Sequence, residues 1–153
     1  MAALVRVPQL ATVVRAAVGI LLLGLGLPAL SAEGTAQEVL KSAGLDAGLC
    51  VHLGCGQAKT VALTADLAAG SRLLVHGLAL DDASLARARQ PIDAKGLNGR
   101  AMVERASVAP LPYLPDLANL VVIEDFDALA GAGLTMDEVN RVVAGRYSKT
   151  SWA

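Results

Sequence analysis

Aromatic residues, cysteine and positive charge are all scarce in this chain. Of its 153 residues, 3% are aromatic and two are cysteine, and the formal net charge is -1. Few rings are available to stack on bases, and no basic excess neutralises phosphates, so these shortages argue against a dedicated nucleic-acid-binding protein. Two cysteines also cannot form a disulfide framework.

Aliphatic residues dominate instead. Hydrophobic residues make up 54% of the chain, which is too much for an intrinsically disordered protein. The length fits one domain better than two. Because Ala, Leu, Val and Gly supply most of this content, the composition suits β-α units in which helices lie close on a sheet.

The N-terminal segment differs from the rest of the chain. Two arginines precede an uncharged stretch from Ala16 to Ala32, which is shorter than the roughly 20 apolar residues of a membrane-spanning helix. A basic start, a Leu-rich centre and small residues before Glu33 are typical of a secretory signal peptide. We therefore predict a signal peptide over residues 1–32, cleaved after Ser31 or Ala32, and export to the periplasm or beyond. The alternative is an uncleaved N-terminal anchor.

Helices and strands are predicted to alternate after this segment. Short apolar runs bounded by turn residues predict strands at Leu49–Leu53, Leu73–Leu78, Ala101–Glu104 and Leu120–Ile123. Capping and stop residues predict helices from Thr35 to Gly44, from Ala62 to Gly70, from Asp81 or Asp82 to an early end at Pro91, and from Thr135 to Gly145. Continuously apolar strands that alternate with helices indicate a parallel sheet covered on both faces.

A glycine-containing loop follows the first of these strands. Gly54-Cys55-Gly56 lies between a predicted strand and a predicted helix, as a Rossmann-type loop requires. The first glycine permits a tight turn, and the second lets a ligand approach the backbone. Alone, the Gly-x-Gly pattern is weak evidence, but its place between strand and helix strengthens it.

Several segments resemble class I S-adenosylmethionine-dependent methyltransferases. The segments that carry the resemblance are, in order along the chain, Val51–Gly56, Val75–Leu78, Ala86–Arg89, Leu111–Tyr113, Leu117–Val122 and Met136–Val143. The likeness is strongest to secreted bacterial proteins in which such a domain is joined to a quinoprotein-like β-propeller, although this chain has no propeller segment.

The resemblance implies an α/β fold, a Rossmann-like, mostly parallel sheet with helices on both faces. The domain would cover residues 33–145, followed by an irregular tail over residues 146–153. A complete domain of this family has seven strands, whereas about four are predicted here, so the fold is expected to be incomplete. In a truncated domain of this kind the strand Leu120–Ile123 would have an unpaired edge.

The resemblance also implies a binding site for S-adenosylmethionine. His52, Gly54, Cys55 and Gly56 would lie under this cofactor, and Asp81 would reach its ribose by a shift of its loop. Glu124 and Asp125 follow the fourth predicted strand and would touch the substrate.

Three positions depart from the family pattern. Where the family usually has an acid that helps hold the methionine amino group, this chain has His52. Ala79 stands where an acid normally grips the ribose hydroxyls, and Ser107 stands near the expected adenine-side acid. Loss of the ribose contact alone should weaken binding by roughly 10- to 100-fold.

Other residues have structural interpretations. Cys50 is expected in the core, Cys55 beside the ligand, and Arg87 and Arg89 on a solvated helix face. A metal bound by His52 and His76 is not expected, because no further ligands cluster near them. The run Glu124–Asp127 is interpreted mainly as a solvated acidic loop. No catalytic residue is assigned.

Two functions follow from these observations. The first is a small-molecule methyltransferase that uses S-adenosylmethionine, with the exported location as an argument against activity because the cofactor is made in the cytosol. The second is a non-catalytic, exported scaffold or interaction module with a degenerate methyltransferase fold. Neither function involves nucleic acid, and neither involves a membrane once the signal peptide is removed.

Overall fold

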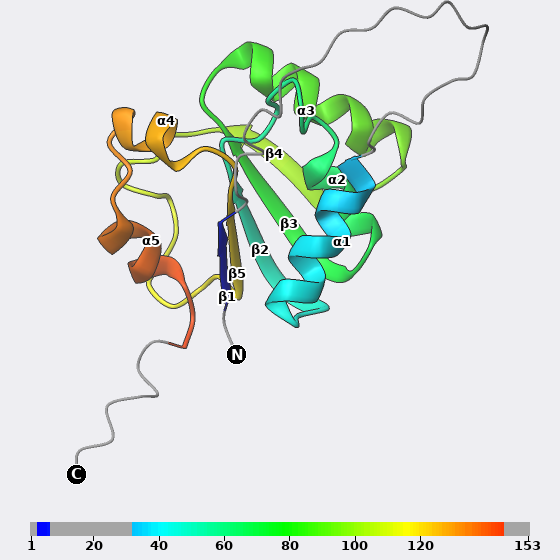
Figure 1. The fold of residues 1–153 in the computed structure, drawn as a ribbon. Coiled ribbons are helices and arrows are strands. Elements are labelled where there is room, and N and C mark those ends of the chain that lie inside the picture. The colour runs from blue at the N-terminus through cyan, green and yellow to red at the C-terminus, as the bar shows by residue number, and fades with distance from the viewer. Residues whose placement is uncertain (1–2, 7–31, 146–153) are drawn as a thin grey trace, which may run out of the picture.

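A five-stranded, all-parallel sheet forms the centre of the computed structural model, which describes residues 3–6 and 32–145 (Figure 1). The strands are β1 (Ala3–Arg6), β2 (Ala47–Leu53), β3 (Arg72–Ala79), β4 (Ala101–Arg105) and β5 (Leu120–Ile123). The helices are α1 (Ala32–Ala43), α2 (Leu63–Ala69), α3 (Asp82–Ala94), α4 (Phe126–Gly131) and α5 (Met136–Val142). The predicted Rossmann-like α/β class is confirmed.

The order of the strands creates a topological switch point. The sheet order is β1-β5-β2-β3-β4, so the chain leaves β2 for β3 and β4 on one side and then crosses to β5 on the other. In open parallel sheets a crevice forms at the carboxyl ends of strands where the order reverses in this way. Here the switch point lies between β2 and β5.

The outer edge of β5 is paired, contrary to the expectation of an unpaired edge. Strand β1 lies parallel to β5, with Ala3 opposite Leu120 and Arg6 opposite Ile123. This strand falls inside the predicted signal peptide, of which residues 7–31 lie outside the described part of the chain. Cleavage after residue 32 would therefore remove β1 from the sheet.

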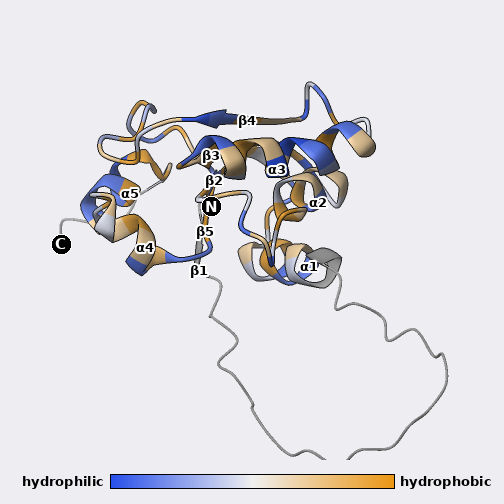
Figure 2. Ribbon diagram, turned by 90° about the horizontal axis from the view of Figure 1, so that it is seen from above, coloured by the Kyte–Doolittle hydropathy of each residue, from blue (hydrophilic) through white to orange (hydrophobic). Residues whose placement is uncertain are grey.

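Helices cover the two faces of the sheet unequally. Helices α1, α2 and α3 pack on one face, over side chains such as Cys50 and Val75, whereas α4 and α5 lie on the other side (Figure 2). On this second face Val51 and Val121 are fully buried, but Leu74 is 54% exposed and Met102 is 62% exposed. The second face is thus covered over β2, β5 and the Leu78 end of β3, and open at Leu74 of β3 and Met102 of β4.

The ends of several helices differ from the prediction. Helix α1 begins at Ala32, so Thr35 lies within the helix and does not cap it. Helix α3 continues past Pro91 to Ala94, so the proline, which has no N–H, costs the helix one hydrogen bond but does not end it. The cap at Thr135 is confirmed, since its hydroxyl accepts a hydrogen bond from the Glu138 amide at 3.2 Å.

Candidate functional site

The glycine loop follows β2 and turns over the end of β3. Gly54 and Gly56 have φ values of +78° and +86°, which favour glycine at both positions. The amides of Gly54 and Cys55 both donate to the Leu78 carbonyl, at 2.9 and 3.1 Å. The loop therefore sits at the carboxyl edge, as predicted, but its first amides are bonded within the protein.

Gly56 lies directly against the first turn of α3. A Cβ atom at Gly56 would overlap the backbone carbonyl of Ser84. Arg87 reinforces this contact, because its Nε donates to the Gly56 carbonyl and its guanidinium also donates to the Ser84 hydroxyl, both at 2.9 Å. The second glycine thus permits close packing of the loop on the helix.

Arg87 and Arg89 are exposed on the outer face of α3, as predicted, and both also donate hydrogen bonds to neighbouring elements. Arg87 joins the glycine loop to α3, and Arg89 donates to the Val103 carbonyl of β4 at 3.3 Å. Both side chains tie α3 to neighbouring elements. Helical periodicity places them on the outer face but does not show which carbonyls lie within their reach.

Asp81 lies where β3 passes into α3, and it caps the helix. Its two carboxylate oxygens accept from the amide and the hydroxyl of Ser84, each at 2.8 Å. The hydrogen bond from the Ser84 amide lowers the pKa of the exposed Asp81 carboxyl below its usual value, with a further contribution from the Ser84 hydroxyl. Ala79, two residues earlier, is fully buried. The β3 end therefore offers two carboxylates, and both are engaged: Asp81 caps the helix, and Asp82 pairs with Arg105 at 3.1 Å.

A buried polar group lies on the other side of the glycine loop. His52, at 0% exposure, points both ring nitrogens at side chains from other elements. Its Nδ1 is 2.8 Å from the Thr64 hydroxyl of α2, and its Nε2 is 2.7 Å from Oε1 of Glu124, which directly follows β5. Thr60, from the loop after Gly56, donates its hydroxyl to Oε2 of Glu124.

The interpretation of residues 124–127 as a solvated acidic loop is wrong for Glu124 and Asp125. The Glu124 side chain is 6% exposed, and the Asp125 carboxylate caps α4 by accepting from the Ala128 amide at 3.0 Å. Glu124 is buried because His52 and Thr60, which are distant in sequence, meet it at the switch point. Asp125 points to the terminus of α4.

Two atoms of this group have unused hydrogen-bonding capacity. Although 2.7 Å separates His52 Nε2 from Glu124 Oε1, the two atoms are not aligned as a hydrogen bond, and neither has another partner within the described residues. Buried polar atoms are nearly always hydrogen-bonded in folded proteins. The pair is therefore a buried polar contact between β2 and the residue after β5, and neither atom is open to solvent.

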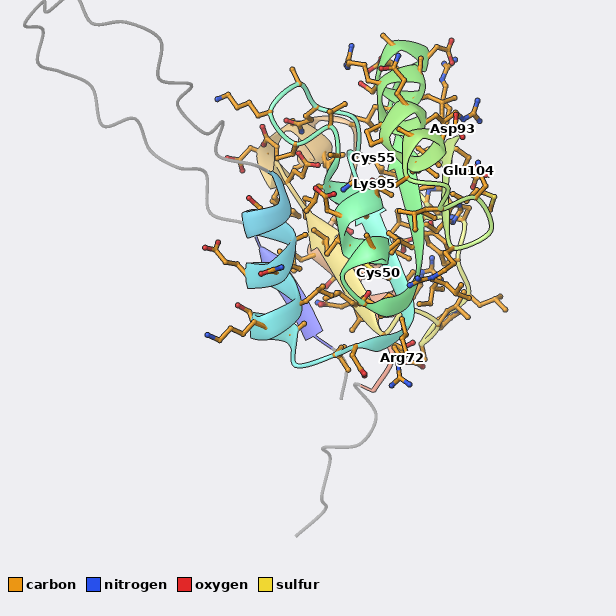
Figure 3. The ribbon with its side chains drawn as sticks, turned by 90° about the vertical axis from the view of Figure 1, so that its right-hand side faces the viewer. Cys50, Cys55, Arg72, Asp93, Lys95 and Glu104 are labelled. Carbon is orange, nitrogen blue, oxygen red and sulfur yellow. The ribbon has the colours of Figure 1, made fainter. Side chains whose placement is uncertain are left out.

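Cys50 and Cys55 both lie on the face of the sheet that α2 covers. Both are free and buried, and Figure 3 shows Cys55 beyond Cys50 toward the carboxyl ends of the strands. Burial raises the pKa of each thiol to about 12, so neither is a thiolate at neutral pH. The expected core position of Cys50 is confirmed, and Cys55 packs against Gly77.

His52 and His76 point to opposite faces of the sheet. His76 lies beside Tyr113, with 2.9 Å between Nδ1 and the phenol oxygen, on the face away from α2. Within residues 3–6 and 32–145, no group of three or more metal-ligating side chains comes together. Nor does any helix in those ranges have the length and apolarity to span a membrane.

Ser107 takes part in its own turn, donating to the Ala109 carbonyl at 3.0 Å and accepting from the Ala109 amide at 3.1 Å.

A hollow of about 560 Å³ lies over β3 and β4 and is lined by residues such as Leu74, Arg100 and Met102. Its lining includes no residue of the glycine loop. We therefore place the candidate site by its polar groups and topology, since this hollow lies apart from both.

The site residues fit S-adenosylmethionine unequally. The polar side chains of His52 and Glu124 and the Gly54–Gly56 loop lie at the edge of the sheet where its polar amino-acid end would be placed. Buried Ala79 offers no acceptor to a ribose. The residues therefore fit one end of this cofactor and lack the usual acceptor for the other.

Solved structures share this fold at low sequence identity. A protein from Methanococcus maripaludis named for S-adenosyl-L-methionine-dependent methyltransferases is 23% identical, with a TM-score of 0.63 over 74% of this chain and 51% of its own. The geranyl diphosphate C-methyltransferase of Streptomyces coelicolor, solved with S-adenosyl-L-homocysteine, is 13% identical, with a TM-score of 0.56 over 72% and 40%. The chain shares the Rossmann-like α/β fold of these proteins.

The same fold also occurs in a protein named for another reaction. The [4+2]-cyclase SpnF is 18% identical and matches with a TM-score of 0.62 over 73% of this chain and 41% of its own. This chain spans about half the length of these structures or less. No protein-family model matches the chain, and no curated protein sequence matches it either. Shared architecture therefore identifies the fold, and the reaction must be argued from the site.

Proposed function

We propose that this chain is an S-adenosylmethionine-binding domain of the methyltransferase type, with its ligand in the crevice between β2 and β5. The observation that carries the proposal is the meeting of the Gly54–Gly56 loop with the buried His52–Glu124 pair at the switch point. Open parallel sheets bind ligands at such a point. The fold neighbours named for methyltransferases support the same ligand class.

The protein's own residues would position the ligand. The glycine loop would lie beneath it, while Glu124, held by His52 and Thr60, would accept hydrogen bonds from its polar end. When bound, the sulfonium of S-adenosylmethionine supplies a methyl group to a nucleophile placed in line with it. Catalysis of this kind depends mainly on positioning, so no strong catalytic signature need appear in the sequence. The methyl acceptor would be a small molecule.

A second candidate is a scaffold without methyltransferase activity. The observation that favours it is the full burial of Ala79, together with the use of Asp81 as a helix cap. A domain that no longer needed to hold a ribose would be free to accept both changes. Export of the protein, and linkage to a β-propeller in longer relatives, would agree with such a role; both are proposals from the sequence alone.

Isothermal titration calorimetry of the full chain with S-adenosylhomocysteine tests the first candidate. We expect binding in the range of tens to hundreds of micromolar, because the usual ribose carboxylate is absent and such a contact is worth roughly 10- to 100-fold. No detectable binding at millimolar ligand would contradict the proposal and leave the scaffold as the better account.

A further inference from the structure

The hollow over β3 and β4 is a second concave surface, separate from the candidate site. Its volume of about 560 Å³ lies within the range of roughly 300–1,000 Å³ that is usual for small-molecule pockets. Its lining includes Leu74 and Met102, which are 54% and 62% exposed on the open face of the sheet. Parallel sheets are normally covered on both faces, and an apolar hollow left open on one of them is typical of a binding site.

Two arginines line the hollow, Arg89 and Arg100. Three other arginines of the described chain each pair with a carboxylate: Arg72, Arg105 and Arg141. The two arginines of the hollow form no such pair within that part of the chain, and their Nη2 groups donate to backbone carbonyls. A carbonyl leaves the charge of a guanidinium uncompensated, and each group keeps N–H donors that these bonds do not use.

The other polar side chains of the lining do not cancel this charge. Asp93 supplies one carboxylate against the two guanidinium groups, and it already accepts a hydrogen bond from the Asn98 amide at 3.1 Å. Burial lowers the pKa of His76 below its usual value, so its ring is neutral at neutral pH. The hollow therefore combines an apolar lining with an excess of positive charge.

We propose that this hollow is a binding site for a small apolar anion, a carboxylate with a hydrocarbon tail. The tail would lie against Leu74 and Met102, and the acid group would face the guanidinium groups. Guanidinium groups bind carboxylates through parallel N–H donors, whereas a neutral or cationic molecule would leave the arginines without a counter-charge. The proposal is independent of the proposed function, because the lining shares no residue with the Gly54–Gly56 loop or the His52–Glu124 pair.

Displacement of a neutral fluorescent probe from the unaltered full chain tests the charge preference. The probe is phenylnaphthylamine, whose fluorescence rises in apolar surroundings, and the competitors are decanoate and decyltrimethylammonium, which have equal tails and opposite charges. We expect decanoate to displace the probe at a concentration about 5-fold lower, the upper range for an exposed ion pair. Saturating S-adenosylhomocysteine should not displace it. Failure of the probe to bind, equal displacement by the two competitors, or displacement by S-adenosylhomocysteine would each overturn the proposal.

Substitution of the arginines tests the source of that preference. Arg89→Gln and Arg100→Gln each remove one positive charge from the lining and should each reduce the preference for decanoate about 2-fold or more. Arg105→Gln is the matched control, because Arg105 is an exposed arginine of β4 outside the lining, and it should leave the preference unchanged. A preference kept in full by both lining variants would overturn the assignment of the acid group to these arginines.

Substitution of the apolar lining tests where the tail binds. Met102→Gln makes an exposed apolar position polar and should weaken the binding of phenylnaphthylamine about 3- to 5-fold. Leu114→Gln is the control, since Leu114 is 73% exposed and lies outside the lining. Equal affinities in these two variants would place the probe elsewhere and contradict the proposal. Circular dichroism shows whether each variant is folded, and the displacement from the unaltered chain needs no variant.

Discussion

The carboxyl edge of the sheet has two parts, the ends of β2 and β5 and the end of β3, and the sequence predicts ligand-binding residues at both. The structure uses the polar side chains of the two parts differently. At β2 and β5, His52, Thr64 and Glu124 are buried together, and two of their atoms lack aligned partners within the described chain. At β3, Asp81 is fully engaged by Ser84, and Ala79 is buried. The first half retains polar groups suited to a ligand. The second half uses its polar groups to hold α3.

This contrast changes how the glycine loop should be tested. A bulky residue at Gly56 is a common way to block a ligand, but here the Cβ position is already occupied by the Ser84 backbone. Such a variant would lose the fold before it lost the ligand. Substitutions in the β2–β5 half are therefore the informative ones for binding, and those at Gly56 report on the packing of α3.

The largest effect is expected at Gly56. Gly56→Ala should lower the free energy of unfolding by about 3 kcal/mol or more, because it combines a positive φ with a backbone overlap. Gly96→Ala is the matched control, since Gly96 has φ +63° and no atom within 4 Å of an added Cβ, and it should cost about 1 kcal/mol. Urea denaturation measures both. Equal losses would mean that the contact with Ser84 does not constrain the loop.

A smaller effect is expected in the β2–β5 half. Thr64→Val keeps the volume of the side chain but leaves the buried Nδ1 of His52 without its partner, which should cost about 1–3 kcal/mol. Thr60→Val, in the half-exposed loop, is the comparison and should cost less because water can reach that position. A larger loss in the free energy of unfolding for Thr60→Val than for Thr64→Val would contradict the view that the contact between Thr64 and His52 anchors this buried polar group.

The smallest effect is expected at Asp81, and it depends on pH. Because the folded-state pKa of Asp81 is lowered, its contribution to stability is present above the unfolded-state pKa and is lost as the pH falls through the folded-state value. Asp81→Asn keeps a capping side chain and should reduce the loss of melting temperature on acidification, whereas Asp81→Ala should lower the melting temperature slightly at neutral pH. Melting curves at neutral and acidic pH measure both effects. Equal losses of melting temperature on acidification in the unaltered chain and in Asp81→Asn would contradict an ionised Asp81 at the helix terminus.

Sequence patterns predicted the parts of the fold that local rules control. Strand β5 was predicted with its observed bounds because four consecutive apolar residues are buried on both faces of a parallel sheet. Helix α4 was missed because it has six residues, too few for a clear apolar period. The end of α3 is predicted too early, because the helix runs on past Pro91 to Ala94 despite the missing N–H.

The candidate site was harder to predict because its contacts are long-range. The sequence singles out His52 and Glu124 separately, but their proximity depends on β2 lying beside β5, with His52 opposite Val122 in the sheet. Thr60 and Thr64 carry no motif, and they matter only because the loop and α2 return over the strand ends. The helix-capping role of Asp81 was visible from its position before α3, and it competes with the ribose contact expected there.

Hydrogen–deuterium exchange of the full chain, with and without saturating S-adenosylhomocysteine, tests the central claim most directly. If the ligand lies in the crevice between β2 and β5, peptides that contain Cys50–Gly56 and Ile123–Asp125 should gain protection. Peptides over Leu80–Ala83, where the β3 end is occupied by the helix cap, should change much less. Protection confined to Leu80–Ala83, or no protection anywhere, would contradict the assignment of the site to the β2–β5 half.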